Sequence, residues 1–186
     1  MAVAVFCNDY LAPRSVDPDF STEYDAARAA GFDTMLVSYE DLTKGVGLSR
    51  PVKGQPLPGP GIYRGWMLTP EQYGQLYHAL EELGIQLVNT PIEYVHAHHF
   101  PNCYPIISGT TPTSISLRID GSPDFDRIHE LLSVFGSKPI VLKDYVKSEK
   151  HYWREACYIP DASDREQAER VTRRFLELRG DQLNEG

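Results

Sequence analysis

The first forty residues constrain the fold most, because they alternate between two buried strands and a helix. Ala2 to Cys7 is a compact run of β-branched and aromatic residues, typical of a buried strand, and Thr34 to Tyr39 is a second one. Ser21 or Thr22 can cap a helix that runs to Ala30 between them. A strand–loop–helix–strand order predicts a parallel sheet in an α/β fold.

The same alternation of helix and strand signals continues to about residue 100. Thr69-Pro70-Glu71-Gln72 combines an N-cap threonine, a proline at the first helical position and a glutamine at the third. The pattern recurs in Thr90-Pro91-Ile92-Glu93, and Ile85 to Val88 between them is predicted as a strand. Residues 61–67 are predicted as a short strand and turn. They follow residues 44–61, a Gly- and Pro-rich stretch expected to form a lid or an edge loop.

The second half of the chain is predicted to add a strand hairpin to this alternation. Ser114 to Ile119 alternates as a strand, and Ser122-Pro123-Asp124 caps a helix after it. Pro139 to Leu142 is a short apolar run typical of a buried strand, and Glu155 to Ile159 is its expected return strand. Ser163-Asp164-Arg165-Glu166 is predicted to be a capping box for the last helix. The expected domains are 1–100, a crossover linker at 101–112, and 113–186.

The net charge excludes some classes of partner. The chain has 18 Lys and Arg against 26 Asp and Glu, a formal net charge of −8. A broad nucleic-acid or membrane surface needs a basic face, so we expect no nucleic-acid and no membrane partner. No apolar run approaches the roughly 20 residues that span a bilayer, and the N-terminus lacks the features of a signal peptide. We therefore expect a cytoplasmic protein.

Neither the cysteines nor the histidines predict a metal centre. The three cysteines are odd in number, far apart and without CxxC spacing, so reduced thiols are expected. His96, His98 and His99 are clustered, and residues 96 and 99 could share a helical face for metal ligation. Histidines at a helix end are the simpler interpretation.

A lysine cluster follows the strand predicted at Pro139 to Leu142. Lys143 stands at the strand's end, and Lys147 and Lys150 follow it in the predicted loop. The stem of a strand-end lysine can pack while its ammonium is held at a cleft mouth. Because an ammonium is a point charge, such lysines can hold a polyphosphate without a fixed fork geometry. A charged, solvated surface hairpin is the alternative, and the residues alone leave both open.

Two other predicted strand ends carry polar side chains. Asn8 and Asp9 end the first strand, where open α/β sheets place ligand-binding loops, although Asn and Asp also make local bonds in turns. Arg64 lies between aromatic residues and beside Gly65. Its planar fork could meet a carboxylate or phosphate in a cleft, or it could stack on a Tyr or Trp at a rim.

Five motifs spread over nearly all of the chain carry a resemblance to a known family. They are Val5-Phe6-Cys7-Asn8-Asp9, Tyr63-Arg64-Gly65-Trp66-Met67-Leu68-Thr69-Pro70, Val88-Asn89-Thr90-Pro91, Val141-Leu142-Lys143-Asp144-Tyr145-Val146-Lys147-Ser148 and Glu155-Ala156-Cys157-Tyr158-Ile159-Pro160. With them the chain resembles the ATP-grasp superfamily, in particular a bacterial and phage clade marked by one arginine and two lysines. The resemblance implies an α/β fold in which a pre-ATP-grasp parallel α/β layer precedes the α+β N-terminal subdomain of the ATP-grasp fold.

The resemblance also implies an activity and a cofactor. ATP-grasp ligases use ATP and Mg²⁺ to phosphorylate a carboxylate, and an amine then displaces the phosphate to form an amide. Small-molecule acids and amines are therefore the expected substrates. Lys143 matches the strand lysine and Lys147 the loop lysine that meet the phosphates of ATP, and Lys150 stands next to them as a further cofactor-binding residue.

On the substrate side the resemblance points to residues of the first half. Arg64 is the best match for an arginine that orients the acceptor carboxylate, and it is the expected catalytic residue. Arg118 is the alternative match to the clade's arginine and is expected near the cofactor. Asn8 and Asp9 would line the acceptor pocket, by their position at the end of the first strand.

The chain departs from the family pattern at its C-terminal end. In the family a second subdomain supplies the adenine-pocket strand and the acidic residues that hold Mg²⁺, and these are expected to be absent here. The sequence then predicts the N-terminal part of a carboxylate–amine ligase, inactive alone and weak in ATP binding. The alternative is a short non-catalytic module that binds a ligand or a protein partner. An apolar edge left uncovered would favour a homodimer.

Overall fold

The computed structural model describes residues 2–48, 58–119, 121–180 and 183. The chain forms two compact units, Met1–Val95 and His96–Gly186. Part of the predicted Gly- and Pro-rich loop, residues 49–57, lies outside the described residues. So do residues 184–186, where the predicted departure from the family pattern begins.

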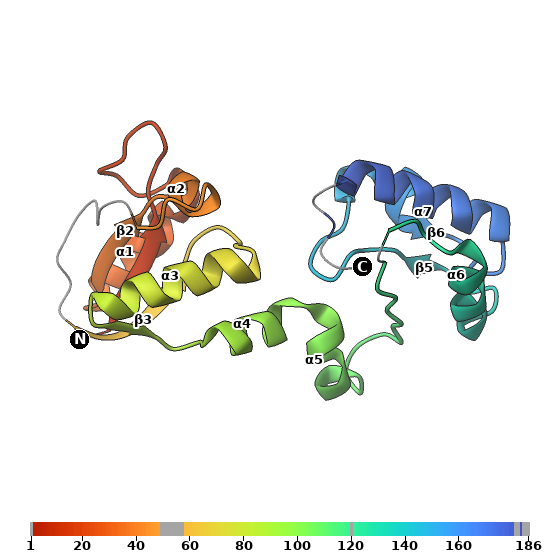
Figure 1. The fold of residues 1–186 in the computed structure, drawn as a ribbon, viewed down its shortest axis with the longest axis horizontal. Coiled ribbons are helices and arrows are strands. Elements are labelled where there is room, and N and C mark those ends of the chain that lie inside the picture. The colour runs from red at the N-terminus through yellow and green to blue at the C-terminus, as the bar shows by residue number, and fades with distance from the viewer. Residues whose placement is uncertain (1, 49–57, 120, 181–182, 184–186) are drawn as a thin grey trace. The chain divides into compact units, whose positions relative to one another are not determined.

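The first unit is built on a four-stranded parallel sheet in the order β2-β1-β3-β4 (Figure 1). Its strands are β1 (Val3–Cys7), β2 (Asp33–Val37), β3 (Gly59–Arg64) and β4 (Ile85–Leu87). The register pairs Val5 of β1 with Met35 of β2 on one side and with Tyr63 of β3 on the other. β1 is therefore central and buried along its whole length, which confirms the predicted α/β fold with a parallel sheet.

Helices cover both faces of this sheet. Alternate residues of a strand point to opposite faces, so β1 sends Val5 to one core and Phe6 to the other. The Val5 face packs on α3 (Pro70–Glu82), and the Phe6 face packs on α1 (Ser21–Ala29). The remaining helical elements here are the 3₁₀ turn Pro18–Phe20, α2 (Tyr39–Thr43) and α4 (Pro91–His98), which leads into the second unit.

One predicted helix start is confirmed and another is wrong. At α3, the Thr69 hydroxyl accepts from the N–H of Gln72, whose side chain accepts from the N–H of Thr69 at 2.9 Å, a complete capping box. At α1 the cap position is Phe20, without a side-chain bond, and Ser21 donates its hydroxyl to the Pro18 carbonyl instead. The reason is that the 3₁₀ turn runs directly into α1, so the orphan N–H groups are already engaged.

The second unit has little sheet and more helix. β5 (Ile140–Val141) and β6 (Tyr158–Ile159) form a two-residue antiparallel ladder. The helical elements are α5 (Phe100–Ile107), α6 (Phe125–Leu132), α7 (Arg165–Arg179), the 3₁₀ turns Ser133–Phe135 and Lys150–Tyr152, and the π-helical turn Trp153–Cys157. The hairpin and both helices after residue 120 were predicted. Helix α5 occupies most of the segment predicted as a crossover linker, residues 101–112, because its Pro101 falls in the first turn, where no N–H is needed.

The strand predicted at Ser114 to Ile119 does not form. The segment has no regular structure, and the backbone N–H of Ser114 donates to the hydroxyl of Tyr104 at 3.0 Å. An alternating pattern becomes a strand only where a neighbouring edge accepts its backbone bonds. β5 offers only two residues, paired with β6.

Two further local predictions for the second unit need correction. The return strand at Glu155 to Ile159 is extended only at its last two residues, because Ala156 and Cys157 sit in a helical turn that packs on Phe175 of α7. The last helix is capped by Asp164 alone, whose carboxylate accepts from the N–H of Gln167 at 2.9 Å. A short polar side chain directly before the first helical residue has the right reach for this bond.

Candidate functional site

The lysine loop, defined as residues 143–150, follows β5 in the second unit. The N–H of Leu142 still bonds to the Cys157 carbonyl at 2.7 Å, so Lys143 is the first residue beyond the ladder. Its side chain is exposed, and its Nζ lies 4.9 Å from the centroid of the Phe100 ring. The ring holds the ammonium through its quadrupole without neutralising it.

Lys143 stands at the rim of a cavity of about 830 Å³ within the second unit. The cavity is lined mainly by apolar side chains of β5, α6, α7 and the irregular segment 112–119, among them Leu117, Ile128 and Phe175. Polar groups enter near the loop, where Lys138 and Asp144 also contribute to the lining. A strand-end ammonium beside a cavity is the geometry that the sequence predicts for an anion-binding lysine.

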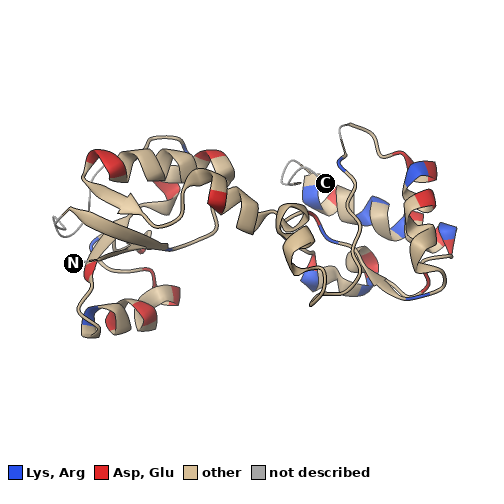
Figure 2. Ribbon diagram, turned by 90° about the horizontal axis from the view of Figure 1, so that it is seen from below, with Lys and Arg blue, Asp and Glu red and all other residues tan. Residues whose placement is uncertain are grey.

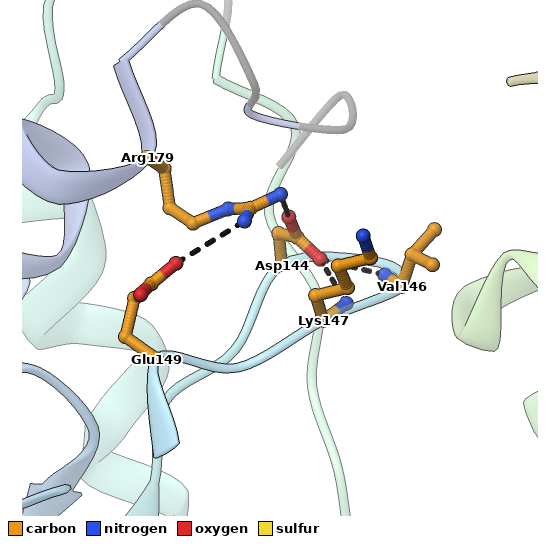
Figure 3. Close-up of polar contacts among 5 residues, drawn as sticks. All are labelled: Asp144, Val146, Lys147, Glu149 and Arg179. Carbon is orange, nitrogen blue, oxygen red and sulfur yellow. Dashed lines mark hydrogen bonds and ion pairs between the residues drawn. The ribbon is translucent and has the colours of Figure 1, made fainter. Parts of the chain in front are cut away.

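The loop is folded around the carboxylate of Asp144, which is 1% exposed (Figure 3). Its Oδ1 accepts from the N–H of Val146 at 2.7 Å and from the N–H of Lys147. The N–H of Asp144 in turn donates to the carbonyl of Lys147 at 2.9 Å. These bonds close a tight turn between Lys143 and Lys147, so the loop has a defined backbone conformation.

Arg179, the last residue of α7, ties both ends of this loop together (Figure 3). Its Nη2 lies 2.7 Å from Oδ2 of Asp144, and its Nη1 lies 3.1 Å from Oε1 of Glu149. Arg179 is 6% exposed, so the pair with Asp144 is a buried ion pair. A planar guanidinium can serve two carboxylates at once, which an ammonium cannot do with fixed geometry.

The junction of α4 and α5 packs against the same loop. The N–H of Phe100 donates to the Tyr145 carbonyl at 2.9 Å, and the ring of the buried His99 lies 6.0 Å from that of Tyr145. Burial lowers the pKa of His98 below its ordinary value, and the nearby charges of His99 and Lys147 act in the same direction. His98 is therefore biased to its neutral form beside the loop.

The other predicted cofactor-binding residues also lie in the second unit. Lys147 is exposed, Lys150 is exposed at the start of the 3₁₀ turn Lys150–Tyr152, and Arg118 is exposed in the irregular segment. Basic residues are concentrated in this unit. Its sequence has nearly balanced charges, whereas the first unit has twice as many acidic as basic residues, visible as the red bands on its helices (Figure 2).

The predicted substrate-binding residues lie in the first unit. Asn8 is buried at the end of β1, and its N–H donates to the Val37 carbonyl at 2.9 Å. Asp9 uses its Oδ1 to accept from the N–H groups of Leu11 and Ala12, at 2.7 Å and 3.2 Å. The Asp9 carboxylate therefore makes local turn bonds, which is the alternative that the residues had left open.

Arg64, the predicted catalytic residue, ends β3 and forms an ion pair with Glu23 of α1. Two guanidinium nitrogens contact the carboxylate, with Nε at 3.3 Å from Oε2. Both side chains are about half exposed, so the pair is worth little, about 0–1 kcal/mol. An acceptor carboxylate could displace Glu23 at small cost.

A buried thiol lies on the neighbouring strand. Cys7 Sγ is 3.3 Å from the hydroxyl of Tyr63, which donates to the Trp66 carbonyl at 2.7 Å. Burial raises the pKa of the Cys7 thiol, and the hydrogen bond with Tyr63 opposes this only in part. The thiol is therefore neutral and is not poised as a nucleophile.

Metal and membrane features were searched over the described part of the chain. Within it, no group of three His, Cys, Asp or Glu is placed to hold a metal ion. None of its helices is long and apolar enough to cross a membrane.

Asp144, Glu149 and Arg179 are the residues of the site that the sequence did not indicate. Asp144 had a local signal, because an Asp two and three residues before the N–H groups it accepts is typical of a turn. Arg179 had none, since a charged residue before a helix-ending glycine is ordinarily solvated.

The comparisons with known proteins single out the C-terminal part of the chain. Residues 134–186, which include the lysine loop and α7, match a family model for the ATP-grasp domain, namely family 3 of the clade named for one arginine and two lysines. A search of curated proteins found no match.

Proposed function

Because residues 134–186 belong to the ATP-grasp superfamily, we propose that the lysine loop binds the phosphates of ATP in an ATP-dependent carboxylate–amine ligase. The observation that carries this proposal is the position of Lys143. Its ammonium is exposed at a cavity rim, at the end of β5, inside the matched segment. Lys147 follows across the Asp144 turn and offers a second cation to the same anion.

The reaction proposed is amide formation through an acyl phosphate. The γ-phosphoryl group passes from ATP to a carboxylate oxygen of the acid, and ADP leaves. The amine nitrogen then attacks the carbonyl carbon, the new C–N bond forms, and phosphate departs with the C–O bond. In both steps negative charge accumulates on phosphate oxygens, and fixed ammonium groups stabilise it.

ATP-grasp proteins typically use Mg²⁺ together with ATP, and the metal would spread charge between the β- and γ-phosphates. The described residues fit the nucleotide's phosphates better than the metal, because they offer lysines at the cavity rim and no cluster of three metal ligands. We therefore assign the lysines to phosphate contact.

For the acceptor side we propose Arg64, with Asn8 and Asp9 as neighbours at the sheet edge. Arg64 and Asn8 stand at the carboxyl ends of adjacent parallel strands, β3 and β1. That edge is where open α/β sheets bind ligands. Exchange of Glu23 for a substrate carboxylate would keep the guanidinium's two-pronged pairing.

Titration with Mg²⁺-ATP tests the phosphate site. Lys143→Met should weaken ATP binding by roughly tenfold to a hundredfold, because a hydrogen bond to a charged group contributes about 1.5–3 kcal/mol. Lys44→Met, which removes an exposed lysine of the first unit, is the matched control and should bind as the wild type does. Equal affinities for wild type, Lys143→Met and Lys44→Met, or no binding by wild type at millimolar ATP, would contradict the proposal.

A second function is favoured by the lining of the cavity. A largely apolar space of about 830 Å³ suits an apolar ligand in a non-catalytic binding module. The two functions differ in product. A ligase releases ADP when an acid and an amine are supplied together, whereas a binding module takes up ligands without ADP release.

A further inference from the structure

The conformation of the lysine loop depends on an arginine that does not itself face the cavity. Arg179 is absent from the cavity lining, whereas Lys143 and Asp144 belong to it. The guanidinium sits behind the loop and contacts Asp144 at one end and Glu149 at the other (Figure 3). Both contacts come from the last residue of α7, so the helix end and the loop are joined at two points.

The first consequence concerns geometry. The Asp144 carboxylate uses Oδ1 for the N–H groups of Val146 and Lys147 and Oδ2 for Arg179. One oxygen shapes the turn and the other fixes the carboxylate to the helix. Without Arg179 the carboxylate would be a buried, uncompensated anion, and it would have to rotate toward water or take up a proton. Either change removes the acceptor that holds the turn.

The second consequence concerns charge. Asp144 follows Lys143 directly, and its negative charge would weaken the attraction of a phosphate to that lysine. The opposite charge of Arg179 at 2.7 Å cancels this field inside the unit, where screening by solvent is weak. The exposed ammonium groups of Lys143 and Lys147 then dominate the potential at the loop's surface.

We propose that Arg179 is a positioning residue for polyphosphate binding. It sets the backbone of the lysine loop and offsets the Asp144 charge, without touching the nucleotide. This inference rests on the proposed function, since it concerns the affinity of the same loop for phosphates. It adds that the site's affinity is controlled from the C-terminal end of α7.

The test compares Arg179→Met with Lys143→Met in titrations with ATP and with inorganic tripolyphosphate, well below the unfolding temperature. Arg179→Met should weaken binding of both probes by about tenfold or more, comparable with the loss of one charged hydrogen bond. Arg179→Lys restores the charge but not the fork, so its affinity should fall between the two. Arg173→Met is the matched control, because Arg173 is an exposed residue of the same helix paired with Glu169.

Two measurements separate positioning from a general loss of stability. Hydrogen exchange in the peptide covering residues 143–150 should become faster in Arg179→Met, while peptides of β1 keep the wild-type rate. The amide proton of Lys147, which donates to a carboxylate, should move upfield in the same variant. A merely structural role would lower the unfolding temperature and leave both loop readouts and the affinity of the folded protein unchanged.

A milder variant keeps the test decisive if Arg179→Met fails to fold. Glu149→Gln removes one of the two contacts while the Asp144 pair remains, and it should weaken binding severalfold. If Lys143→Met weakens binding but Glu149→Gln and any folded Arg179 variant bind as the wild type does, the inference is wrong and the proposed function stands. If Lys143→Met also binds as the wild type does, the proposed function fails, and this inference fails with it.

Discussion

The two units solve the problem of stability in different ways. The first unit buries a strand along its whole length between two helical layers, and its main core joins strands β1, β2 and β4 to α3. The second unit has two-residue strands, small core clusters around Phe175 and Ile159, and a cavity of about 830 Å³. At its lysine loop, buried ion pairs take the place that apolar packing has in the first unit.

This contrast shows what each kind of interaction can do. Apolar contacts are non-directional and stabilise a layer of any suitable shape. The Arg179 pairs specify one position for each carboxylate, and they leave room beside the loop. A binding site needs a defined backbone next to empty space, so the less compact unit is the better host for it.

The largest effect is expected from removing matched leucines in the two units. Leu76→Ala should cost roughly 2–5 kcal/mol of unfolding free energy, because Leu76 is fully buried between α3 and the sheet. Leu131→Ala should cost about 1 kcal/mol, since Leu131 is half-buried and already borders the cavity. Denaturant unfolding measures both, and hydrogen exchange assigns each loss to a unit. Equal losses would break the contrast between the units.

An intermediate effect is expected from adding one methyl group at a glycine. A Cβ at Gly65 would lie 2.5 Å from Cys7 Sγ and 2.6 Å from the Tyr63 hydroxyl. Gly65→Ala should therefore destabilise the first unit by about 1–3 kcal/mol. Gly109 of the second unit has no neighbour within 4 Å among the atoms described, so Gly109→Ala should change stability by about 0.5 kcal/mol at most. Thermal unfolding of both variants provides the comparison, and a neutral Gly65→Ala would show that the first unit is not tightly packed there.

The smallest effect is a pH dependence confined to the second unit. The pKa of His98 is lowered by burial, by His99 and by Lys147, and is raised by Asp144 to a lesser extent. The unfolded chain then binds the proton more tightly than the folded one, so stability is present above the ordinary pKa of 6.5 and is lost as the pH falls below it. His98→Gln should flatten this acid dependence, followed by hydrogen exchange of the lysine loop between pH 7.5 and about 5.

The control for this pH dependence is His78→Gln in the first unit. His78 is exposed and pairs only with the exposed Glu81 on its own helix, among the contacts described. Its replacement should leave the pH profile as it is in the wild type. An unchanged profile in His98→Gln would mean that another group controls the acid sensitivity of the loop.

Local patterns in the sequence were sufficient where a structure depends on near neighbours along the chain. The capping box at Thr69 and the helix ending at Gly180 need only residues a few positions apart, and both form. The pattern at Ser114 to Ile119 failed because a strand needs a partner edge, which lies elsewhere in the chain. The Ser163 capping box failed by one residue, since Ser163 bonds to Asp161 and leaves Asp164 to cap the helix.

By itself the sequence determined the parallel sheet of the first unit and the place of Lys143 at the end of a strand, because periodicity and turn residues act over short range. Only the tertiary structure decided that Arg179 reaches Asp144 and Glu149. These residues lie about thirty positions apart, and their pairing depends on how α7 packs over the hairpin. A charge carries no mark in the sequence of the partner it will meet, and burial alone makes that meeting consequential.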